Sequence, residues 1–396
     1  MAKLLEITGK AISGEWGQDD DTGTGIPVLR TTNFTNEGFV NYKNVVTRSI
    51  SKKNIAEKYL RHGDVIIEKS GGSDKQPVGR VIFFEGEENK YLFNNFTGLL
   101  RVQNPEEWLP KYVFYALYAY YRNGGTRAFE NRTTGLHNLQ VDNYVKSVDI
   151  PKLSYRKQQH ICETLDHVRD AVAYRERQLT KLDELIKARF VEMFGDLVEN
   201  PKQFPCVLLG SIMTVMPQNG LYKPQSAYVQ DKFGTPILRI DGFYNGKVTD
   251  FNNLKRLCCT DFEKERYLLV ENDIVINRVN SIEYLGKCAR ISGLQEDTVF
   301  ESNMMRFHLD DSKVNSTYIT TVLCSQYIYR QILTRAKKAV NQASINQGDV
   351  QSLNVVVPPL SLQNQFADFV AEVDKSKLLA ELFAQSTCIL AENRSK

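Results

Sequence analysis

The sequence predicts an α+β protein in which two similar strand-rich domains alternate with two long helices. Three observations lead to this fold class: a duplicated stretch, buried-strand patterns that follow each copy in the same order, and a long apolar repeat after each set. The duplicated stretch reads GIPVLRTTNF from residue 25 and GTPILRIDGF from residue 234. Between 25–40 and 234–249, six of sixteen positions are identical.

Length and composition are those of an ordinary globular protein. The 396 residues (45.3 kDa) predict two or three domains, and 42% of them are hydrophobic. The net charge of +3, from 50 basic and 47 acidic residues, neither requires nor excludes a nucleic-acid partner. The seven cysteines form no CxxC pair, and the N-terminus lacks a secretory signal. We therefore expect a reduced, cytoplasmic protein without a membrane span.

Four further segments repeat in order after the first. The strand-like HGDVIIEKS (62–70) matches ENDIVINRV (271–279), which pairs Asp64 with Asp273. The other three pairs are GRVIFFEG with GKCARISG, FTGLLRV with ESNMMRF, and DIPKLSYRKQQ with VVPPLSLQNQF. This alignment pairs Arg101 with Arg306 and Ser154 with Ser361. Five collinear segments indicate a duplication. The strand-rich part also contains one clear amphipathic helix, around 108–121.

A long helix is expected after each strand-rich part. Apolar residues recur there with alternating spacings of four and three, which is typical of a coiled-coil seam, and Ser154 and Ser361 are suitable N-caps. Neither helix can bury its seam alone, so we expect the two to pack antiparallel about a pseudo-twofold axis as a spacer. The predicted seam residues are Ile161, Leu165, Val168, Val172, Leu179, Leu182, Ile186, Phe366, Phe369, Val373 and Phe383.

These patterns predict four regions along the chain. Residues 1–150 form the first strand-rich domain and 151–200 the central long helix. Residues 201–357 form the second strand-rich domain and 358–396 the C-terminal long helix.

Motifs of enzymatic chemistry are not recognisable. The segment GGSDKQPVGR is not a P-loop, and DTGTG at 21–25 has no counterpart in the second copy, so it is interpreted as a loop. Glu68-Lys69 follows a strand as in some nucleases, but Asn277-Arg278 stands at that place in the second copy. His160 and His167 are interpreted as helix-surface residues, and Cys258-Cys259 as a packed pair. We therefore predict neither a catalytic nor a metal site.

Two similar but unequal heads on a spacer suit a DNA site with two different halves. Side chains that hydrogen-bond bases and phosphates follow corresponding strands of both copies. An ordinary solvated loop remains the alternative for any one of them. The predicted DNA-binding residues are Arg30, Thr31, Asn33, Lys69, Ser70, Ser73, Lys75, Gln76, Arg132, Thr133, Arg239, Asp241, Asn277, Arg278, Asn280, Ser281, Lys338, Asn341 and Gln342.

The whole pattern resembles the specificity subunit of type I restriction–modification systems. The resemblance lies in GIPVLRTTNF/GTPILRIDGF, in GDVIIEKSGGS with NDIVINRVNS, and in the IPKLSYRKQQ and VPPLSLQNQ segments that lead into long helices. It implies two target-recognition domains, each reading half of a split asymmetric DNA site. It also implies helices that set the spacer and dock two methyltransferase subunits, with restriction subunits joining the complex.

By the same resemblance, this chain is a non-catalytic subunit without a cofactor. S-adenosylmethionine, ATP and Mg²⁺ would be bound by the partner subunits. The chain lacks FxGxG and NPP[FYW], which an adenine methyltransferase would carry. Two alternatives remain open: a protein-assembly scaffold whose heads bind protein, and a self-sufficient restriction enzyme, which the missing motifs disfavour.

Overall fold

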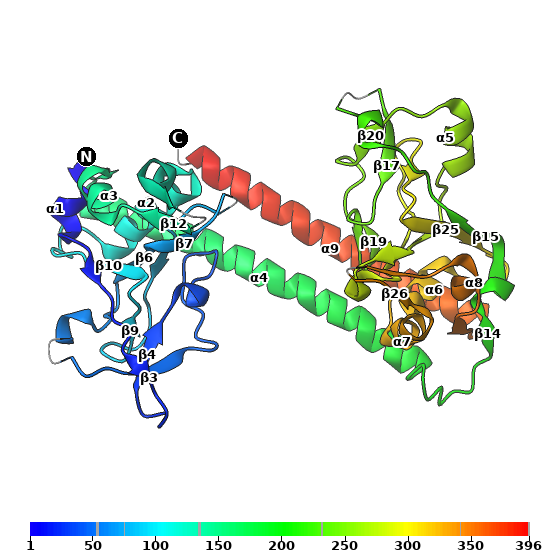
Figure 1. Ribbon diagram of the computed structural model, residues 1–396, viewed down its shortest axis with the longest axis horizontal. Coiled ribbons are helices and arrows are strands. Elements are labelled where there is room, and N and C mark those ends of the chain that lie inside the picture. Colours follow the sequence, from blue (N-terminus) through cyan, green and yellow to red (C-terminus); the bar gives the residue numbers. More distant parts are fainter. Residues whose placement is uncertain (53–54, 75, 134–135, 231–232, 341, 395–396) are drawn as a thin grey trace. The chain divides into compact units, whose positions relative to one another are not determined.

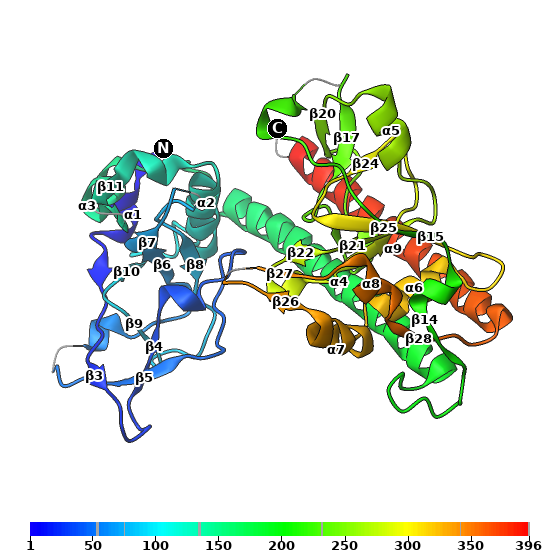
Figure 2. The same cartoon turned by 45° about the vertical axis from the view of Figure 1, so that its right-hand side comes forward.

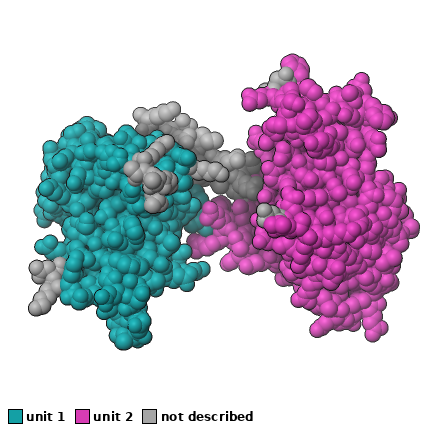
Figure 3. Space-filling model, in the orientation of Figure 1, with its two compact units in different colours: residues 1–173, 387–396 teal, residues 174–386 magenta. Residues whose placement is uncertain are grey.

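The computed structural model describes the chain except residues 53–54, 75, 134–135, 231–232, 341 and 395–396, and except the side chains of 132–133, 136 and 380–394 (Figure 1). Its contacts divide the chain into two units, which Figure 3 colours separately. Unit 1 comprises residues 1–173 and 387–396, and unit 2 comprises 174–386. Each long helix is thus divided between the two units, and the four-region division stays a prediction.

Unit 1 is built in three layers around a central sheet of order β2-β10-β6-β8. In β6 (Val65–Glu68), Val65 and Ile67 enter the core beneath the helix α2 (Pro110–Arg122), whereas Ile66 faces a second sheet of order β3-β5-β4-β9. Because both faces are covered, the strand is apolar at successive positions instead of alternating. The strands of the two sheets are β2 (Ile12–Ser13), β3 (Gln18–Asp19), β4 (Ile26–Leu29), β5 (Val46–Ser49), β8 (Val81–Phe83), β9 (Leu92–Phe93) and β10 (Thr97–Leu100).

Smaller elements complete unit 1. A three-stranded sheet joins β7 (Ser70–Gly72), β12 (Leu136–Leu139) and β11 (Glu130–Thr133) in the order β7-β12-β11. The strand β1 (Ala2–Lys3) pairs with β13 (Asp149–Ile150), which brings the start of the unit to the segment before the long helix. The helices α1 (Leu4–Thr8) and α3 (Val141–Ser147) pack beside that pair.

Unit 2 repeats this architecture. Its central sheet has the order β15-β25-β21-β23-β19-β18, and its second sheet has the order β16-β20-β17-β24. In β21 (Ile274–Asn277), Ile274 and Ile276 face a core that includes α6 (Ser316–Leu323) and α7 (Gln326–Arg335), and Val275 faces the other way. The remaining strands are β15 (Met213–Asn219), β16 (Tyr228–Val229), β17 (Thr235–Leu238), β18 (Phe243–Tyr244), β19 (Gly246–Val248), β20 (Lys255–Leu257), β23 (Cys288–Arg290), β24 (Val299–Phe300) and β25 (Met304–Leu309).

The smaller elements also recur in unit 2. A three-stranded sheet of order β22-β27-β26 joins β22 (Val279–Asn280), β27 (Ala343–Ser344) and β26 (Lys337–Lys338), which lie side by side in Figure 2. The strand β14 (Cys206–Leu208) pairs with β28 (Asn354–Val356), as β1 pairs with β13. The helices α5 (Asp261–Tyr267) and α8 (Gln347–Gln351) complete the unit. The duplication predicted from sequence is therefore a duplication of fold.

Strand register corrects the sequence alignment at one segment. Leu100 pairs with Val65 in unit 1, and Phe307 pairs with Ile274 in unit 2. Since the Val65 position corresponds to Ile274, Leu100 corresponds to Phe307, and Arg101 therefore corresponds to His308. The sequence alignment of Arg101 with Arg306 is wrong by two residues. It matched the arginine of one segment with the arginine of the other, although the two do not occupy equivalent positions.

The alignment of Ser154 with Ser361, before the two long helices, is also wrong by two residues. The helix α4 (Tyr155–Phe194) begins after Ser154, whereas α9 (Leu360–Arg394) begins one residue before Ser361. The first bonds of α9 go from the Leu362 and Gln363 amides to the Pro359 carbonyl, so the Ser361 N-cap prediction is wrong. A proline fits this boundary because its ring already favours the turn into a helix and needs no N–H there.

A buried glutamine joins the start of α4 to unit 1, and another joins the start of α9 to unit 2. The Gln158 side chain accepts from the Leu109 amide (2.8 Å) and donates to the carbonyls of Glu107 (2.9 Å) and Leu153 (3.0 Å). Gln363 likewise accepts from the Asn315 amide (2.8 Å) and donates to the Pro358 carbonyl (2.7 Å). These equivalent contacts tie the start of α4 to α2 and the start of α9 to α6.

Within unit 2, α9 packs antiparallel to α4, as predicted. The Phe366 ring lies 5.4 Å from Phe190 and 5.6 Å from Phe194, and Arg189 lies 5.7 Å from the Phe369 ring. Farther along, Lys377 forms an ion pair with Asp183. Because numbers rise along α9 as they fall along α4, the two helices run in opposite directions.

The seam itself is only partly as predicted. Leu179, Leu182 and Ile186 on α4 are half-buried, as are Ile161 and Val168, but Leu165 and Val172 are 37% and 38% exposed. On α9 the buried line runs through Phe366, Val370 and Val373, and Phe369 is half-buried beside it. The buried amide of Gln363 fixes this helical phase, which places Val370 inward. The Phe383 side chain lies outside the described residues.

Among the described residues, every helix is too short or too polar to cross a membrane. In the same part of the chain, no group of three His, Cys, Asp or Glu side chains is arranged to hold a metal ion.

Candidate nucleic-acid interface

The loop after β4 carries the first predicted DNA-binding residues. Arg30 is half-buried, and its backbone N–H donates to Asn33 Oδ1 (3.0 Å). Asn33 is only 1% exposed, and its amide donates to the carbonyls of Asn41 (3.0 Å) and Lys43 (3.3 Å). Asn33 therefore holds the loop from inside, and we remove it from the predicted DNA-binding set. Thr31 stays in the predicted set. Its side chain is half-buried, and its carbonyl accepts from the Arg80 guanidinium (3.2 Å).

A cation fixes the corresponding loop in both units. In unit 1, Arg80 binds the Thr31 carbonyl and the buried carboxylate of Glu68 (3.0 Å). In unit 2, Lys287 occupies the position of Arg80, and its ammonium donates to the Ile240 carbonyl (2.7 Å). The sequence analysis did not identify these cations as anchors, although the aligned GRV and GKC segments place both directly after a repeated glycine.

Charged residues surround the loop after β17, which is the unit 2 counterpart of the loop after β4. The Ile240 amide donates to Glu301 (2.6 Å), and Arg239 Nε lies 3.7 Å from the same carboxylate and 3.8 Å from Asp241. Burial raises the pKa of Glu301. Asp241 is exposed next to half-buried Arg239, so this loop presents both signs of charge to solvent.

Aromatic rings surround the Lys287 ammonium. It lies 3.8 Å from the ring centre of Tyr244, 4.9 Å from Phe243 and 5.4 Å from Tyr284. Burial lowers the pKa of Lys287. Tyr244 and Tyr284 are 45% and 47% exposed, so they offer aromatic faces and hydroxyl groups beside the loop. Sequence reasoning missed both, because tyrosine recurs throughout this chain.

In unit 1, the small sheet β7-β12-β11 brings together residues that are distant in sequence. Ser70 in β7 pairs with Asn138 in β12, and Arg132 in β11 pairs with His137. Exposed Ser73 and Gln76 follow β7, joined by a backbone bond from the Ser73 amide to the Gln76 carbonyl (2.7 Å).

The other predicted residues near this sheet differ in what the structure describes. Lys69 is half-buried, and burial lowers its pKa, while its ammonium lies 3.3 Å from Ser13 Oγ. Lys75 and the side chains of Arg132 and Thr133 lie outside the described residues.

The small sheet of unit 2 gathers the corresponding residues. In β22-β27-β26, Asn280 and Lys338 both pair with Ala343 of β27. Lys338 and Gln342 are exposed, and the Gln342 carbonyl accepts from the Ala339 amide (2.7 Å). Lys337 is also exposed and adds a second cation to β26. Asn341 lies outside the described residues.

Three predicted residues at the exit of β21 and β22 are partly or wholly structural. Asn277 is fully buried, and its amide lies 3.4 Å from the Tyr284 carbonyl, so we remove it from the predicted set. Half-buried Arg278 donates to the Ser302 carbonyl (3.1 Å). Ser281 is half-buried, and its amide donates to Asn280 Oδ1 (2.8 Å). These contacts hold the backbone next to β22 in place.

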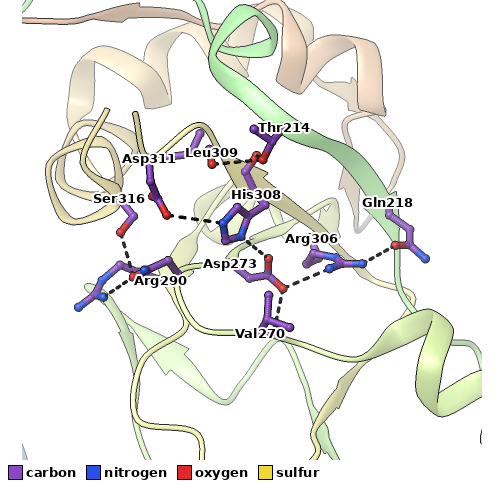
Figure 4. A network of polar contacts seen from close by, with 11 residues as sticks. Thr214, Gln218, Val270, Asp273, Arg290, Arg306, His308, Leu309, Asp311 and Ser316 are labelled. Atoms are coloured by element: carbon purple, nitrogen blue, oxygen red, sulfur yellow. Dashed lines mark hydrogen bonds and ion pairs between the residues drawn. The ribbon is translucent and has the colours of Figure 1, made fainter. Parts of the chain in front are cut away.

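A buried polar network stabilises each unit away from these sheets. In unit 2, the fully buried Asp273 accepts from His308 (2.9 Å), Arg306 (3.3 Å) and the Val270 amide (3.0 Å), as Figure 4 shows. In unit 1, Asp64 is bound by Arg101 through two contacts of 2.7 Å. Both carboxylates are buried and each accepts three hydrogen bonds from the protein, so we interpret these networks as structural.

Comparisons with known proteins agree with the fold. Residues 201–384 match the family model described as type I restriction modification DNA specificity domain. The chain is 31% identical over 185 residues to the MjaX type I restriction enzyme specificity subunit of Methanocaldococcus jannaschii, a match that spans 45% of this chain and 41% of that relative. It is 24% identical over 371 residues to the EcoKI specificity subunit of Escherichia coli, over 88% of this chain and 75% of that one.

Solved structures give the same fold at low sequence identity. The type I restriction–modification S subunit of M. genitalium is 14% identical, with a TM-score of 0.58 over 99% of this chain and 93% of that one. A chain from a study of complex assembly and conformational transition of the type I restriction–modification system is 15% identical, with a TM-score of 0.51 over the same shares. The family model thus matches residues 201–384, and the solved S subunits share the fold over nearly the whole chain.

Proposed function

We propose that this chain is the specificity subunit of a type I restriction–modification complex and binds double-stranded DNA. Each unit reads one half of a bipartite asymmetric site, and α4 and α9 set the unread spacer. The chain itself is non-catalytic. S-adenosylmethionine, ATP and Mg²⁺ serve the methyltransferase and restriction subunits that assemble with it.

The repeated small sheet is the observation that carries this proposal. In both units it lies at the exit of the same central strand, and in both it gathers polar residues from two distant segments. The fold of the sheet is repeated, and exposed polar side chains of different kinds accompany it: Ser73 and Gln76 after β7 in unit 1, and Lys338 on β26 and Gln342 before β27 in unit 2. A common frame with different exposed hydrogen-bonding groups suits two unlike half-sites.

The paired helices support the proposed docking of methyltransferase subunits. Within unit 2, an open groove of about 650 Å³ lies along α4 and α9. Basic Arg175 and Lys181 line it together with apolar Leu182, Leu185 and Leu379. Leu185 and Leu379 are 46% and 56% exposed, and exposed apolar side chains beside an arginine suit a protein interface.

Methylome sequencing tests the function and assigns each unit to its half-site. A strain lacking this gene is complemented with wild type, with S73A/Q76A in unit 1, or with K338A/Q342A in unit 2. We expect deletion to remove one split methylation motif, and each double variant to relax only one half of it. The control is K313A, because exposed Lys313 pairs with Asp310 (2.8 Å) and lies in neither small sheet.

Salt dependence of DNA binding separates this proposal from the protein scaffold. Phosphate contacts release counterions, so the logarithm of affinity should fall steeply with the logarithm of salt concentration. For the complex with its methyltransferase subunits, K337A/K338A should reduce that slope by up to about 2. An unchanged methylome on deletion, together with salt-independent or absent DNA binding, would refute the proposal.

A further inference from the structure

Two cysteines of unit 2 lie in direct contact although they are 36 residues apart. Cys288 Sγ is 3.5 Å from Cys324 Sγ, and Cys324 Sγ is 3.9 Å from the Cys288 carbonyl oxygen. Cys288 lies in β23 in the middle of the central sheet, and Cys324 follows the last residue of α6. The helix packs on the strand, so the contact is built into the layer arrangement of the unit.

The environments of the two thiols are unequal. Cys288 is fully buried, whereas Cys324 is an exposed residue whose sulfur points inward. The hydrogen bond to Cys324, together with burial, raises the pKa of Cys288, so this thiol keeps its proton. Accepting that bond lowers the pKa of Cys324, against the opposing effect of burial. The thiol that loses its proton more readily therefore belongs to the more exposed residue, and the second thiol lies in direct contact with it.

We propose that Cys288 and Cys324 form an oxidation site, at which a hydroperoxide converts the two thiols into a reversible disulfide. The Cys324 thiolate attacks the peroxide, the O–O bond breaks, and Cys324 becomes a sulfenic acid while hydroxide leaves. The Cys288 thiol then attacks that sulfur, and water leaves as the S–S bond forms. The two thiols lose two electrons and two protons, and hydrogen peroxide is reduced to two molecules of water.

Geometry favours this pair over Cys162 and Cys206. A disulfide needs sulfurs about 2.05 Å apart, so the present contact must shorten by about 1.5 Å. Cys324 follows the last residue of α6 and lies outside the sheet, so closing this gap requires movement at the helix end and not within β23. Cys162 is buried within unit 1, and exposed Cys206 has its sulfur 3.7 Å from the Tyr327 hydroxyl, so neither has this paired arrangement in the described contacts.

The site lies beside the anchor of the loop after β17. Cys288 directly follows Lys287, which holds the Ile240 carbonyl. The inference does not depend on the DNA-binding proposal, because it concerns the thiols alone and is tested on the protein without DNA.

Peptide mapping of the full-length protein tests the proposal. The reduced protein is treated with hydrogen peroxide, free thiols are blocked, and the digest is analysed by mass spectrometry with and without dithiothreitol. We expect a Cys288–Cys324 cross-linked peptide that is 2 Da lighter than the two thiol peptides together and disappears on reduction. In C288S, Cys324 should instead accumulate as sulfenic or sulfinic acid, which shows that its partner normally captures it.

The C206S variant is the matched control, and it should form the cross-link at the wild-type rate. Closing a loop of this length should also raise the thermal midpoint of oxidised wild type by several degrees over reduced wild type. The proposal is overturned if wild-type Cys288 stays a free thiol while Cys324 is over-oxidised. It is equally overturned if peroxide leaves both residues reduced under conditions that oxidise Cys206.

Discussion

Replacing Arg101 with alanine should destabilise unit 1 strongly. The guanidinium binds both oxygens of Asp64 (2.7 Å each) and donates to the carbonyls of Glu57 (2.9 Å) and Tyr59 (2.8 Å). The Asp64 side chain is only 2% exposed, so R101A leaves a buried carboxylate without its countercharge. Breaking such a pair from one side costs about 3–5 kcal/mol.

Unit 2 supplies the comparison. When Arg306 is replaced with alanine, Asp273 keeps His308 (2.9 Å) and the Val270 amide (3.0 Å). The variant loses a longer contact of 3.3 Å and a hydrogen bond to Gln218 (2.8 Å). We therefore expect R306A to cost only about 1–2 kcal/mol.

Urea denaturation at neutral pH can distinguish the two units. Both tryptophans of the chain, Trp16 and Trp108, lie in unit 1, so their fluorescence reports unit 1, while circular dichroism reports both units. With a slope of about 2–3 kcal/mol/M, R101A should lower the fluorescence midpoint by about 1–2 M. R306A should leave the fluorescence midpoint unchanged. It should lower the midpoint of the unit 2 transition, which only circular dichroism detects.

The control for this experiment is R61A, because Arg61 contacts Asp64 through its backbone N–H (2.7 Å), which alanine retains. Its fluorescence midpoint should stay close to that of wild type. The argument would be refuted if R101A shifted the midpoint by no more than R61A. It would also fail if R306A shifted the tryptophan transition as far as R101A does.

Two further predictions concern buried polar groups. Q158L should destabilise unit 1 by about 2–4 kcal/mol, because the Leu109 amide and two carbonyls lose their hydrogen-bond partner. Tryptophan fluorescence in urea measures this loss. The control Q159L, at the exposed neighbouring position, should cost far less. Burial raises the pKa of Glu301, so the folded state binds this proton more tightly than the unfolded chain. The stability of wild type relative to E301Q should therefore increase as the pH falls from 7 to 5, and a constant difference in circular-dichroism midpoints would contradict this.

Much of the fold could be predicted because its signals are local. A buried strand flanked by two layers is apolar at successive positions, and β6 and β21 both lie where this pattern predicts them. The helix predicted around 108–121 is α2, and α4 begins directly after the predicted N-cap Ser154. The helix α9 begins two residues before the start that an N-cap at Ser361 predicts. The order of the repeats then required two units of the same fold.

Register and helical phase could not be predicted, because they depend on contacts between distant segments. Arg101 corresponds to His308 only because β10 and β25 pair with specific residues of β6 and β21. Val370 lies in the seam because Gln363 is bonded to the loop before α6. Neither contact leaves a periodic signal in the sequence.

For the candidate interface, the order of residues along the chain was enough to predict which segments carry polar side chains and that these segments recur in both copies. Which of those side chains reach solvent depends on how the chain folds around them. Burial assigned Asn33 and Asn277 to the interior, and strand pairing brought Asn280 together with Lys338 from a segment far along the chain. The physical reason is that a polar side chain next to a strand can bond either to the protein backbone or to a ligand. The surrounding fold, which the local sequence does not encode, selects between the two.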